Sequence, residues 1–237
     1  MKMLVTGGSG YIGTKLCKVL GDDYKSYDVK NHPQENILNG PYLDYWVNWS
    51  DVVYHLASPC IIPESLERPF YYWENIYVGT GNVVSSCLKF DKRLVFTSTQ
   101  VVEDRFRCET CGRLNSPYAE AKWAAERLIE KELTDYAIVR LPNVYDYEDK
   151  DPYRSRLIPR LRDSARKDGV VKIYPPITDV VELITLEGVV KGLIKFQTGE
   201  VGVFKLDGEF KTIGEVAEEV AYQFNAKVII TDEVRIK

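Results

Sequence analysis

A tyrosine and a lysine one helical turn apart, Tyr118 and Lys122, are the pair in this chain best suited to proton chemistry. Residues four apart on a helix lie on one face, so the phenol and the ammonium can act at the same place. A phenol titrates near pH ~10, and its use as a neutral-pH acid/base requires the phenolate to be stabilised by about 4 kcal/mol. The positive charge of Lys122 supplies part of that stabilisation.

Three hydroxyl residues end a β-branched run upstream of this pair, at Leu94-Val-Phe-Thr-Ser-Thr99. Hydroxyls at the end of a strand can hydrogen-bond the oxygen of an alcohol or ketone beside Tyr118. The tyrosine–lysine spacing alone also fits an ordinary amphipathic helix. Its order after a hydroxyl-ended strand favours redox chemistry at a carbon–oxygen bond.

A glycine-rich turn near the start of the chain predicts a binding place for a dinucleotide. Gly8-x-Gly10-x-x-Gly13 follows a short apolar run, Met3–Thr6, and precedes a helical pattern. The glycines allow positive φ, backbone approach to a pyrophosphate and close packing of helix on strand. The first turn of the helix then points free N–H groups at the phosphates.

An acid stands where the second strand is expected to end, in Tyr24-Lys-Ser-Tyr-Asp28. A carboxylate there accepts hydrogen bonds from both adenosine-ribose hydroxyls of NAD and repels the 2′-phosphate of NADP. The alternative is a solvated aspartate at a strand end. The spacing favours NAD as the cofactor, with Asp28 on its ribose.

The bulk composition narrows the class of partner. The 237 residues carry a net charge of −4 with acids and bases interspersed, so no basic stripe for nucleic acid and no apolar run of membrane length is present. Met3 already belongs to the first run, so we expect no removable targeting peptide before it. Five scattered cysteines argue against a disulfide framework. We expect a cytoplasmic protein with a small-molecule substrate.

Short β-branched or aromatic runs alternate with helical patterns, which predicts an α/β protein with a doubly wound parallel sheet of Rossmann type. The runs are Met3–Thr6, Lys25–Asp28, Val52–Leu56, Leu94–Ser98 and Ala137–Leu141. We expect an NAD-binding domain over 1–145. The looser remainder, with a helix at 158–166, predicts a small substrate lobe over 146–237, interleaved with the last elements of the Rossmann domain.

Two helical patterns, Glu64–Phe90 and Ser116–Leu133, carry apolar stripes. The stripe residues are Leu66, Phe70, Trp73, Tyr77 and Leu88 in the first, and Ala121, Ala125 or Leu128, and Ile129 in the second. Such stripes pack in a core or against another subunit. A two-fold interface needs only one self-complementary patch, so we expect a homodimer with Trp73 and Trp123 as candidate contacts.

The chain resembles the extended short-chain dehydrogenase/reductase family, in its NAD-dependent epimerase/dehydratase group. The glycine turn also reads as that family's Gly7-x-x-Gly10-x-x-Gly13. The further matching motifs are Asp51-Val-Val-Tyr-His-Leu-Ala-Ser58, Ser65-x-x-x-Pro69 followed by Asn75-x-x-x-Gly79-Thr80-x-Asn82, Arg140-Leu-Pro-Asn-Val-Tyr145 with Asp146 in place of a glycine, and the strand and helix of Val203–Val220.

This resemblance implies roles for individual residues. Thr99 would be the catalytic Ser/Thr, Tyr118 the acid/base, and Lys122 its partner on the nicotinamide ribose. The other implied cofactor contacts are Tyr11 and Ile12 at the pyrophosphate, Asn36 and Ile37 at the adenine, Leu56, Ala57 and Ser58 beneath the cofactor, and Asn75, Thr97, Pro142 and Val144. His55 is a candidate second base, but its place inside a strand favours a structural role.

Departures from the family narrow the reaction. Thr99 is followed by Gln100 and Val101, where the family's 4,6-dehydratases have Asp-Glu and its decarboxylases place a glutamate two residues after the threonine. What remains is redox at a carbinol, so we predict a sugar-nucleotide epimerase. The alternatives are a ketoreductase or dehydrogenase on a smaller substrate, and a non-catalytic NAD sensor.

Two further points stay open. About 90 residues follow Tyr145, where the family usually has considerably more, so the resemblance implies a shortened substrate lobe. Val181 stands where family members often carry an arginine for the nucleotide diphosphate, and Arg154, Arg156, Arg160 or Arg162 is either a substitute or part of a solvated helix face. A second point is the pair Cys108 and Cys111, which lacks the further ligands that zinc needs, so we predict no metal. The pair is either unligated or a reversible disulfide.

Overall fold

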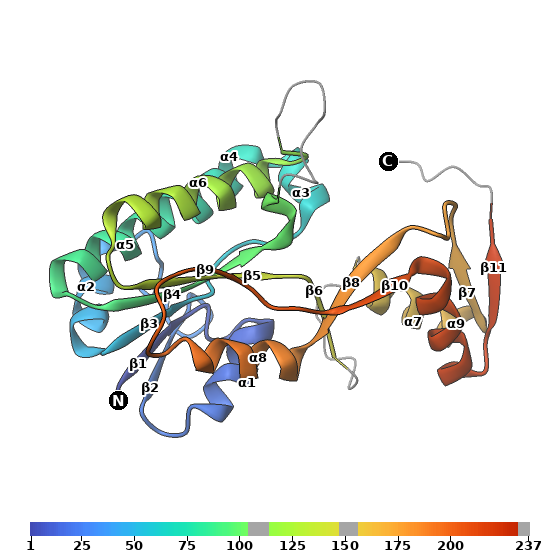
Figure 1. Cartoon of the computed structure of the whole chain (residues 1–237), viewed down its shortest axis with the longest axis horizontal. Coiled ribbons are helices and arrows are strands. Elements are labelled where there is room, and N and C mark those ends of the chain that lie inside the picture. Colours follow the sequence, from blue (N-terminus) through green and yellow to red (C-terminus); the bar gives the residue numbers. More distant parts are fainter. Residues whose placement is uncertain (104–113, 147–155, 232–237) are drawn as a thin grey trace. The chain divides into compact units, whose positions relative to one another are not determined.

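The computed structural model describes residues 1–103, 114–146 and 156–231. The chain divides into two compact units (Figure 1). The first consists of Met1–Leu141 and Glu187–Leu206, and the second of Pro142–Leu186 and Asp207–Lys237. The first unit thus takes in two stretches of the chain, and the second unit begins at Pro142.

The first unit is built on a six-stranded sheet in the order β2-β1-β3-β4-β5-β9, with all neighbours parallel. The strands are β1 Met3–Thr6, β2 Tyr24–Tyr27, β3 Val52–His55, β4 Arg93–Thr99, β5 Tyr136–Leu141 and β9 Gly202–Lys205. The strand order reverses between β1 and β3, which is where doubly wound folds bind their ligands. The predicted fold class is confirmed.

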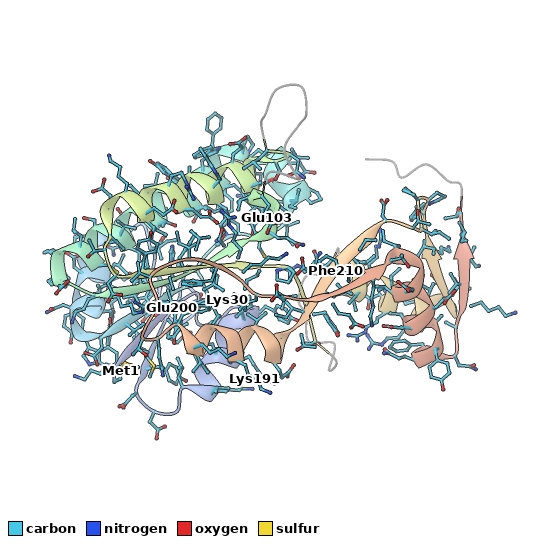
Figure 2. All side chains as sticks on the ribbon, in the orientation of Figure 1. Met1, Lys30, Glu103, Lys191, Glu200 and Phe210 are labelled. Carbon is cyan, nitrogen blue, oxygen red and sulfur yellow. The ribbon has the colours of Figure 1, made fainter. Side chains whose placement is uncertain are left out.

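Helices cover both faces of this sheet (Figure 1). They are α1 Tyr11–Val19, α2 Gly40–Trp49, α3 Ile62–Glu67, α4 Pro69–Trp73, α5 Gly79–Phe90, α6 Pro117–Glu132 and α8 Leu186–Lys195. Side chains between the sheet and α2, α5 and α6 form the main core, drawn as sticks in Figure 2. On the other face Lys15 of α1 pairs with Glu187 of α8 at 2.6 Å.

The prediction of one continuous helix over Glu64–Phe90 is wrong. The chain leaves helical geometry at Arg68, with φ −129° and ψ 56°, because the following proline disfavours a helical residue before it. A π-helical turn, Glu74–Val78, then joins α4 to α5. The apolar residues of the first predicted stripe are all exposed, so that stripe is a surface and not a core.

The second unit contains a three-stranded sheet in the order β10-β8-β6 and a parallel pair, β11 and β7. Its elements are β6 Asn143–Tyr145, α7 Leu157–Asp168, β7 Val170–Ile173, β8 Val180–Thr185, β10 Glu209–Thr212, α9 Ile213–Phe224 and β11 Lys227–Ile230. A capping box between Thr212 and Glu215 starts α9. Across both units, none of the helices in the described ranges is long and apolar enough to cross a membrane.

Candidate cofactor-binding and active site

The glycine turn after β1 leaves no room for side chains. Gly7 has φ +72°, its N–H donates to the Tyr27 carbonyl at 2.9 Å, and a Cβ added to it would lie 2.7 Å from the Ala57 nitrogen. A Cβ on Gly13 would lie 2.2 Å from the Gly7 oxygen. Both positions therefore require glycine, and the turn lies directly against the segment that follows β3.

The first turn of α1 offers backbone donors to an anion. Gly10 precedes the helix in extended geometry, and no described side chain caps the helix there. Tyr11 and Ile12 open the helix, so their N–H groups belong to the donors without an intrahelical acceptor. A glycine cradle with a free helix N-terminus fits the pyrophosphate of a dinucleotide.

The side chain of Asp28 is hydrogen-bonded to the glycine turn. It is buried just beyond β2, and one carboxylate oxygen accepts a hydrogen bond from the Ser9 N–H at 3.1 Å. The other oxygen accepts from the Lys30 N–H at 2.9 Å. The acid predicted for the adenosine ribose thus lies beside the predicted pyrophosphate cradle, at the carboxyl ends of adjacent strands.

The residues predicted at the adenine end are held by the fold. The Asn36 side chain accepts from the Leu38 N–H at 2.9 Å. Ile37 is buried, and a Cβ on Gly79 would lie 2.4 Å from its Cδ1. Ile37 therefore belongs to the core and lies against the start of α5.

The segment after β3 and the π-helical turn carry the next predicted contacts. Leu56, Ala57 and Ser58 are half-buried, and the Ala57 N–H donates to the Thr6 hydroxyl at 3.4 Å. Asn75 is also half-buried, and its side-chain amide donates to the Tyr71 carbonyl at 2.9 Å. These residues belong to the first unit, together with the cradle.

The tyrosine–lysine pair lies near the start of α6, as its spacing predicts. Ser116 caps this helix by accepting from the Ala119 N–H at 3.2 Å. Tyr118 is buried and meets Tyr72 edge to face, with ring centroids 6.3 Å apart. One turn later, the side chain of Lys122 reaches the end of β4.

Lys122 is 3% exposed and donates to the Thr97 carbonyl at 2.8 Å. Its ammonium also lies 4.5 Å from the centre of the Phe96 ring. Burial lowers the pKa of Lys122 to about 8, although charges on Cys60 and Glu126 act in the opposite direction. The ammonium is therefore still the main form at neutral pH, and it places a positive charge on the helix face of Tyr118.

The three hydroxyls that end β4 have different environments. Thr97 donates to the His55 carbonyl at 3.2 Å. Thr99 is half-buried and accepts from the Val101 N–H at 3.4 Å. The hydroxyl of Ser98 is buried and has no hydrogen-bond partner within the described part of the chain.

His55 is a structural residue. Its Nδ1 lies 2.7 Å from the Thr6 hydroxyl and its Nε2 lies 3.0 Å from the Thr80 hydroxyl. Burial, reinforced by the charge of Lys122, lowers the pKa of His55 to about 3. A neutral imidazole between two hydroxyls joins β1, β3 and α5 beneath the site.

An ion pair next to the lysine was not predicted. Glu126, one turn beyond Lys122 on α6, is 0% exposed. It accepts two hydrogen bonds from Arg140 of β5, at 3.1 and 2.7 Å. The continued four-residue spacing from Tyr118 through Lys122 to Glu126 is a signal that would have pointed to Glu126, but not to its partner Arg140.

The remaining predicted residues lie in the second unit or outside the described ranges. Pro142 is buried, and Val144 pairs with Ile184 between β6 and β8. Arg162 is buried and donates to the Asp146 carbonyl at 2.7 Å, so it holds the fold and is not a solvated residue. The other two candidate arginines of α7 and its cap are half-buried.

Residues 108, 111 and 154 lie outside the described ranges, so the structure does not test the predictions for Cys108, Cys111 and Arg154. Within those ranges, no group of three or more His, Cys, Asp or Glu side chains is arranged to hold a metal ion.

A glycine cradle, an acid at the next strand end and a buried tyrosine–lysine helix define an NAD-binding protein of the Rossmann class. The chain belongs to the NAD dependent epimerase/dehydratase family, whose model matches residues 3–200. This match confirms the family resemblance and NAD as the cofactor, and the family is one of oxidoreductase-type enzymes.

Individual relatives are more distant. UDP-N-acetyl-alpha-D-glucosaminuronate decarboxylase of Bacillus cytotoxicus is 26% identical over 204 residues, which cover 73% of this chain and 64% of the relative. UDP-glucose 4-epimerase of Halalkalibacterium halodurans is 28% identical over 150 residues, covering 54% of this chain and 45% of the relative. This chain thus spans less than two thirds of the length of both.

Solved structures share the fold at lower identity. UDP-glucose 4-epimerase of Thermus thermophilus, in complex with NAD, superposes with a TM-score of 0.81 at 21% identity, covering 98% of this chain and 86% of that one. UDP-N-acetylglucosamine 4-epimerase of Methanobrevibacter ruminantium superposes with a TM-score of 0.82 at 21% identity, covering 100% and 86%.

Proposed function

We propose that this protein is a sugar-nucleotide epimerase that inverts a hydroxyl-bearing carbon through transient oxidation to a ketone. The observation that carries the proposal is the buried contact between Lys122 and the end of β4, which brings the helix of Tyr118 to the strand that ends in Thr99. The epimerases among the relatives support this reading.

NAD, when bound, supplies a reversible hydride acceptor. Tyr118 takes the proton of the sugar hydroxyl as the ketone forms and returns it when the alcohol is restored. The Lys122 ammonium stabilises the resulting phenolate. Thr99 donates a hydrogen bond to the substrate oxygen, where negative charge develops. Proton and hydride both return to the substrate, so the reaction needs no net oxidant.

The residues after Thr99 favour redox chemistry without loss of a group. Gln100 is buried, and Val101 packs against the hydrophobic core. Neither position offers the carboxyl that would remove a proton and expel water. The same positions argue against the reaction named for the decarboxylase relative.

The cofactor would extend along the carboxyl edge of the sheet. We assign its pyrophosphate to the cradle of Gly7, Gly10 and Gly13 with Tyr11 and Ile12, its adenosine ribose to Asp28, and its adenine to Asn36 and Ile37. The proposed contacts beyond the pyrophosphate are Leu56, Ala57, Ser58, Asn75, Thr97, Tyr118 and Lys122. The roles of Pro142 and Val144, which belong to the second unit, stay predictions from the sequence.

A second candidate is a reductase of a smaller ketone. 2-Alkyl-3-oxoalkanoate reductase of Stenotrophomonas maltophilia is 28% identical over 192 residues, covering 70% of this chain and 56% of the relative. The same acid/base pair would serve such a reaction. A non-catalytic sensor is disfavoured, because binding NAD alone does not need Tyr118 as an acid/base.

We also propose a homodimer through the first unit. The exposed apolar side chains of α3, α4, the π-helical turn and α5 are Leu66, Phe70, Tyr71, Trp73, Tyr77, Val78 and Leu88. Seven exposed large hydrophobic side chains on consecutive elements favour an interaction surface. One such patch, repeated by a two-fold axis, is enough for a symmetric dimer.

Incubation with UDP-glucose or UDP-N-acetylglucosamine and a catalytic amount of NAD tests the proposed reaction. An epimerase forms the 4-epimer, seen by chromatography, without net change in NADH absorbance. The Tyr118→Phe variant is the matched control. Absence of an epimer, together with NADH consumption on a keto substrate, would replace the epimerase with the reductase.

A further inference from the structure

A buried carboxylate lies behind Asp28 and has no role in the assignments above. Glu35, seven residues after Asp28, has a side chain only 3% exposed. A buried charge of this kind is strongly unfavourable unless it is paired and hydrogen-bonded. Its partners therefore indicate what it does for the fold.

The two oxygens of Glu35 bind a residue of β2 and the residue that follows this strand. One forms an ion pair with the Lys25 ammonium, and the other accepts the Asp28 backbone N–H at 3.0 Å. Lys25 is itself held, since its ammonium lies 4.7 Å from the centre of the Trp46 ring. The loop that starts at Asp28 is thus fastened to the strand that precedes it.

The loop is closed by its own backbone as well. The Asp28 carbonyl accepts from the Asn31 and His32 N–H groups at 2.9 and 3.2 Å, and the His32 carbonyl accepts from the Glu35 N–H at 2.9 Å. Glu35 then returns to the Asp28 N–H. Asp28 is therefore fixed on its backbone by Glu35 and on its carboxylate by Ser9 and Lys30.

We propose that Glu35 is a positioning residue for cofactor selectivity, holding Asp28 where its carboxylate meets the adenosine ribose. The proposal rests on the assignment of that ribose to Asp28. A carboxylate that cannot move away keeps both hydrogen bonds to the hydroxyls of NAD and remains close to the added negative charge of NADP. Fixing Asp28 thus favours NAD over NADP.

Glu35 acts through Asp28 and not by its own charge. Its ion pair with Lys25 is nearly neutral as a unit, so it adds little repulsion toward a phosphate. A loosened loop would let Asp28 turn aside, which lowers affinity for NAD and relieves the clash with NADP. The two dinucleotides should therefore respond differently to loss of Glu35.

Isothermal titration of Glu35→Ala with NAD, NADP, ADP-ribose and nicotinamide mononucleotide tests the proposal without turnover. We expect affinity for NAD and ADP-ribose to fall about tenfold, which corresponds to the loss of one hydrogen bond between the ribose and the charged Asp28 carboxylate. Affinity for the mononucleotide should stay unchanged, and the preference for NAD over NADP should shrink. Glu35→Gln keeps an acceptor for the Asp28 N–H, so its affinity for NAD should lie between those of the wild type and Glu35→Ala.

A double-mutant cycle separates positioning from general destabilisation. If Glu35 works through Asp28, adding Glu35→Ala to Asp28→Ala should cause little further loss of NAD affinity. Asp44→Asn, which removes the charged partner of Lys89 and Ser86 between α2 and α5, is the matched control and should leave both dinucleotide affinities unchanged.

Additive losses in the cycle, or equal losses of NAD and NADP affinity, would overturn the role of Glu35. Unchanged NAD affinity in Asp28→Ala would overturn the ribose assignment and the Glu35 role together. Neither result depends on epimerase activity, so failure of the proposed reaction remains distinguishable.

Discussion

Lys122 binds the backbone carbonyl of Thr97 at 2.8 Å, across the space between α6 and β4. The contact ties the helix that carries Tyr118 to the strand that ends in Thr99. Because the ammonium is hydrogen-bonded to a fixed carbonyl, its charge has a defined position on the helix face of Tyr118. We therefore propose two functions for Lys122, one in positioning and one in electrostatic stabilisation.

Lys122→Met should lower turnover by about a hundredfold and weaken NAD, since it removes both the charge and a ribose donor. Lys122 should also make the stability of the wild-type protein depend on pH. Burial lowers the pKa of Lys122 from 10.5 to about 8, so the unfolded chain binds the extra proton between these values. Unfolding in urea across that window should show the wild type gaining stability relative to Lys122→Met as pH rises.

Tyr118→Phe should leave NAD affinity nearly unchanged, because only a hydroxyl is lost from a buried ring. Turnover should fall by about a hundredfold or more, since the proton relay is gone. Titration with NAD and steady-state kinetics on the same preparation measure both. Turnover close to the wild-type value would remove Tyr118 from the mechanism.

Gly13→Ala should abolish tight NAD binding, because the new Cβ would lie 2.2 Å from the Gly7 oxygen and force the cradle apart. Overpacking of this kind also costs about 1–3 kcal/mol of stability. Gly40→Ala is the matched control, since its Cβ would meet nothing within 4 Å. Equal NAD affinities in the two variants would argue against the cradle as the pyrophosphate site.

His55 makes the fold sensitive to acid. Burial lowers its pKa from 6.5 to about 3, so the unfolded chain takes up the proton first as pH falls through that range. Stability should decrease by about 1.4 kcal/mol per pH unit there from this residue. His55→Gln, although less stable at neutral pH, should lose less on acidification. Urea unfolding of both proteins at neutral pH and at about pH 5 measures this loss. An equal loss of unfolding free energy in the wild type and in His55→Gln would contradict the prediction.

Phe70→Glu should split the proposed dimer, because a charge on the exposed apolar surface would have to be desolvated without a partner. Phe70 is 88% exposed, and Tyr222 of the second unit, at 90%, provides a matched control. Tyr222→Glu should remain dimeric. Light scattering distinguishes the two, and a wild-type monomer at high concentration would end the proposal.

Local signals were enough to place the glycine turn and the helix that carries Tyr118 and Lys122. The glycines, Asp28 and the tyrosine–lysine pair each lie within or next to one element, and their spacing alone predicts a shared face or turn. The order of apolar runs predicted the parallel sheet for the same reason. The predicted ends of these five strands lie within one residue of the observed ends.

Contacts between distant segments needed the tertiary structure. Nothing local pairs Glu126 with Arg140, or turns Glu35 back onto the end of β2. The stripe from Leu66 to Leu88 has the periodicity of a core helix, yet it is exposed. Periodicity shows that a helix has an apolar face, but only packing decides what covers it. Sequence thus determined the chemistry available at the site, and tertiary structure decided which charges are buried beside it, because burial depends on every neighbour at once.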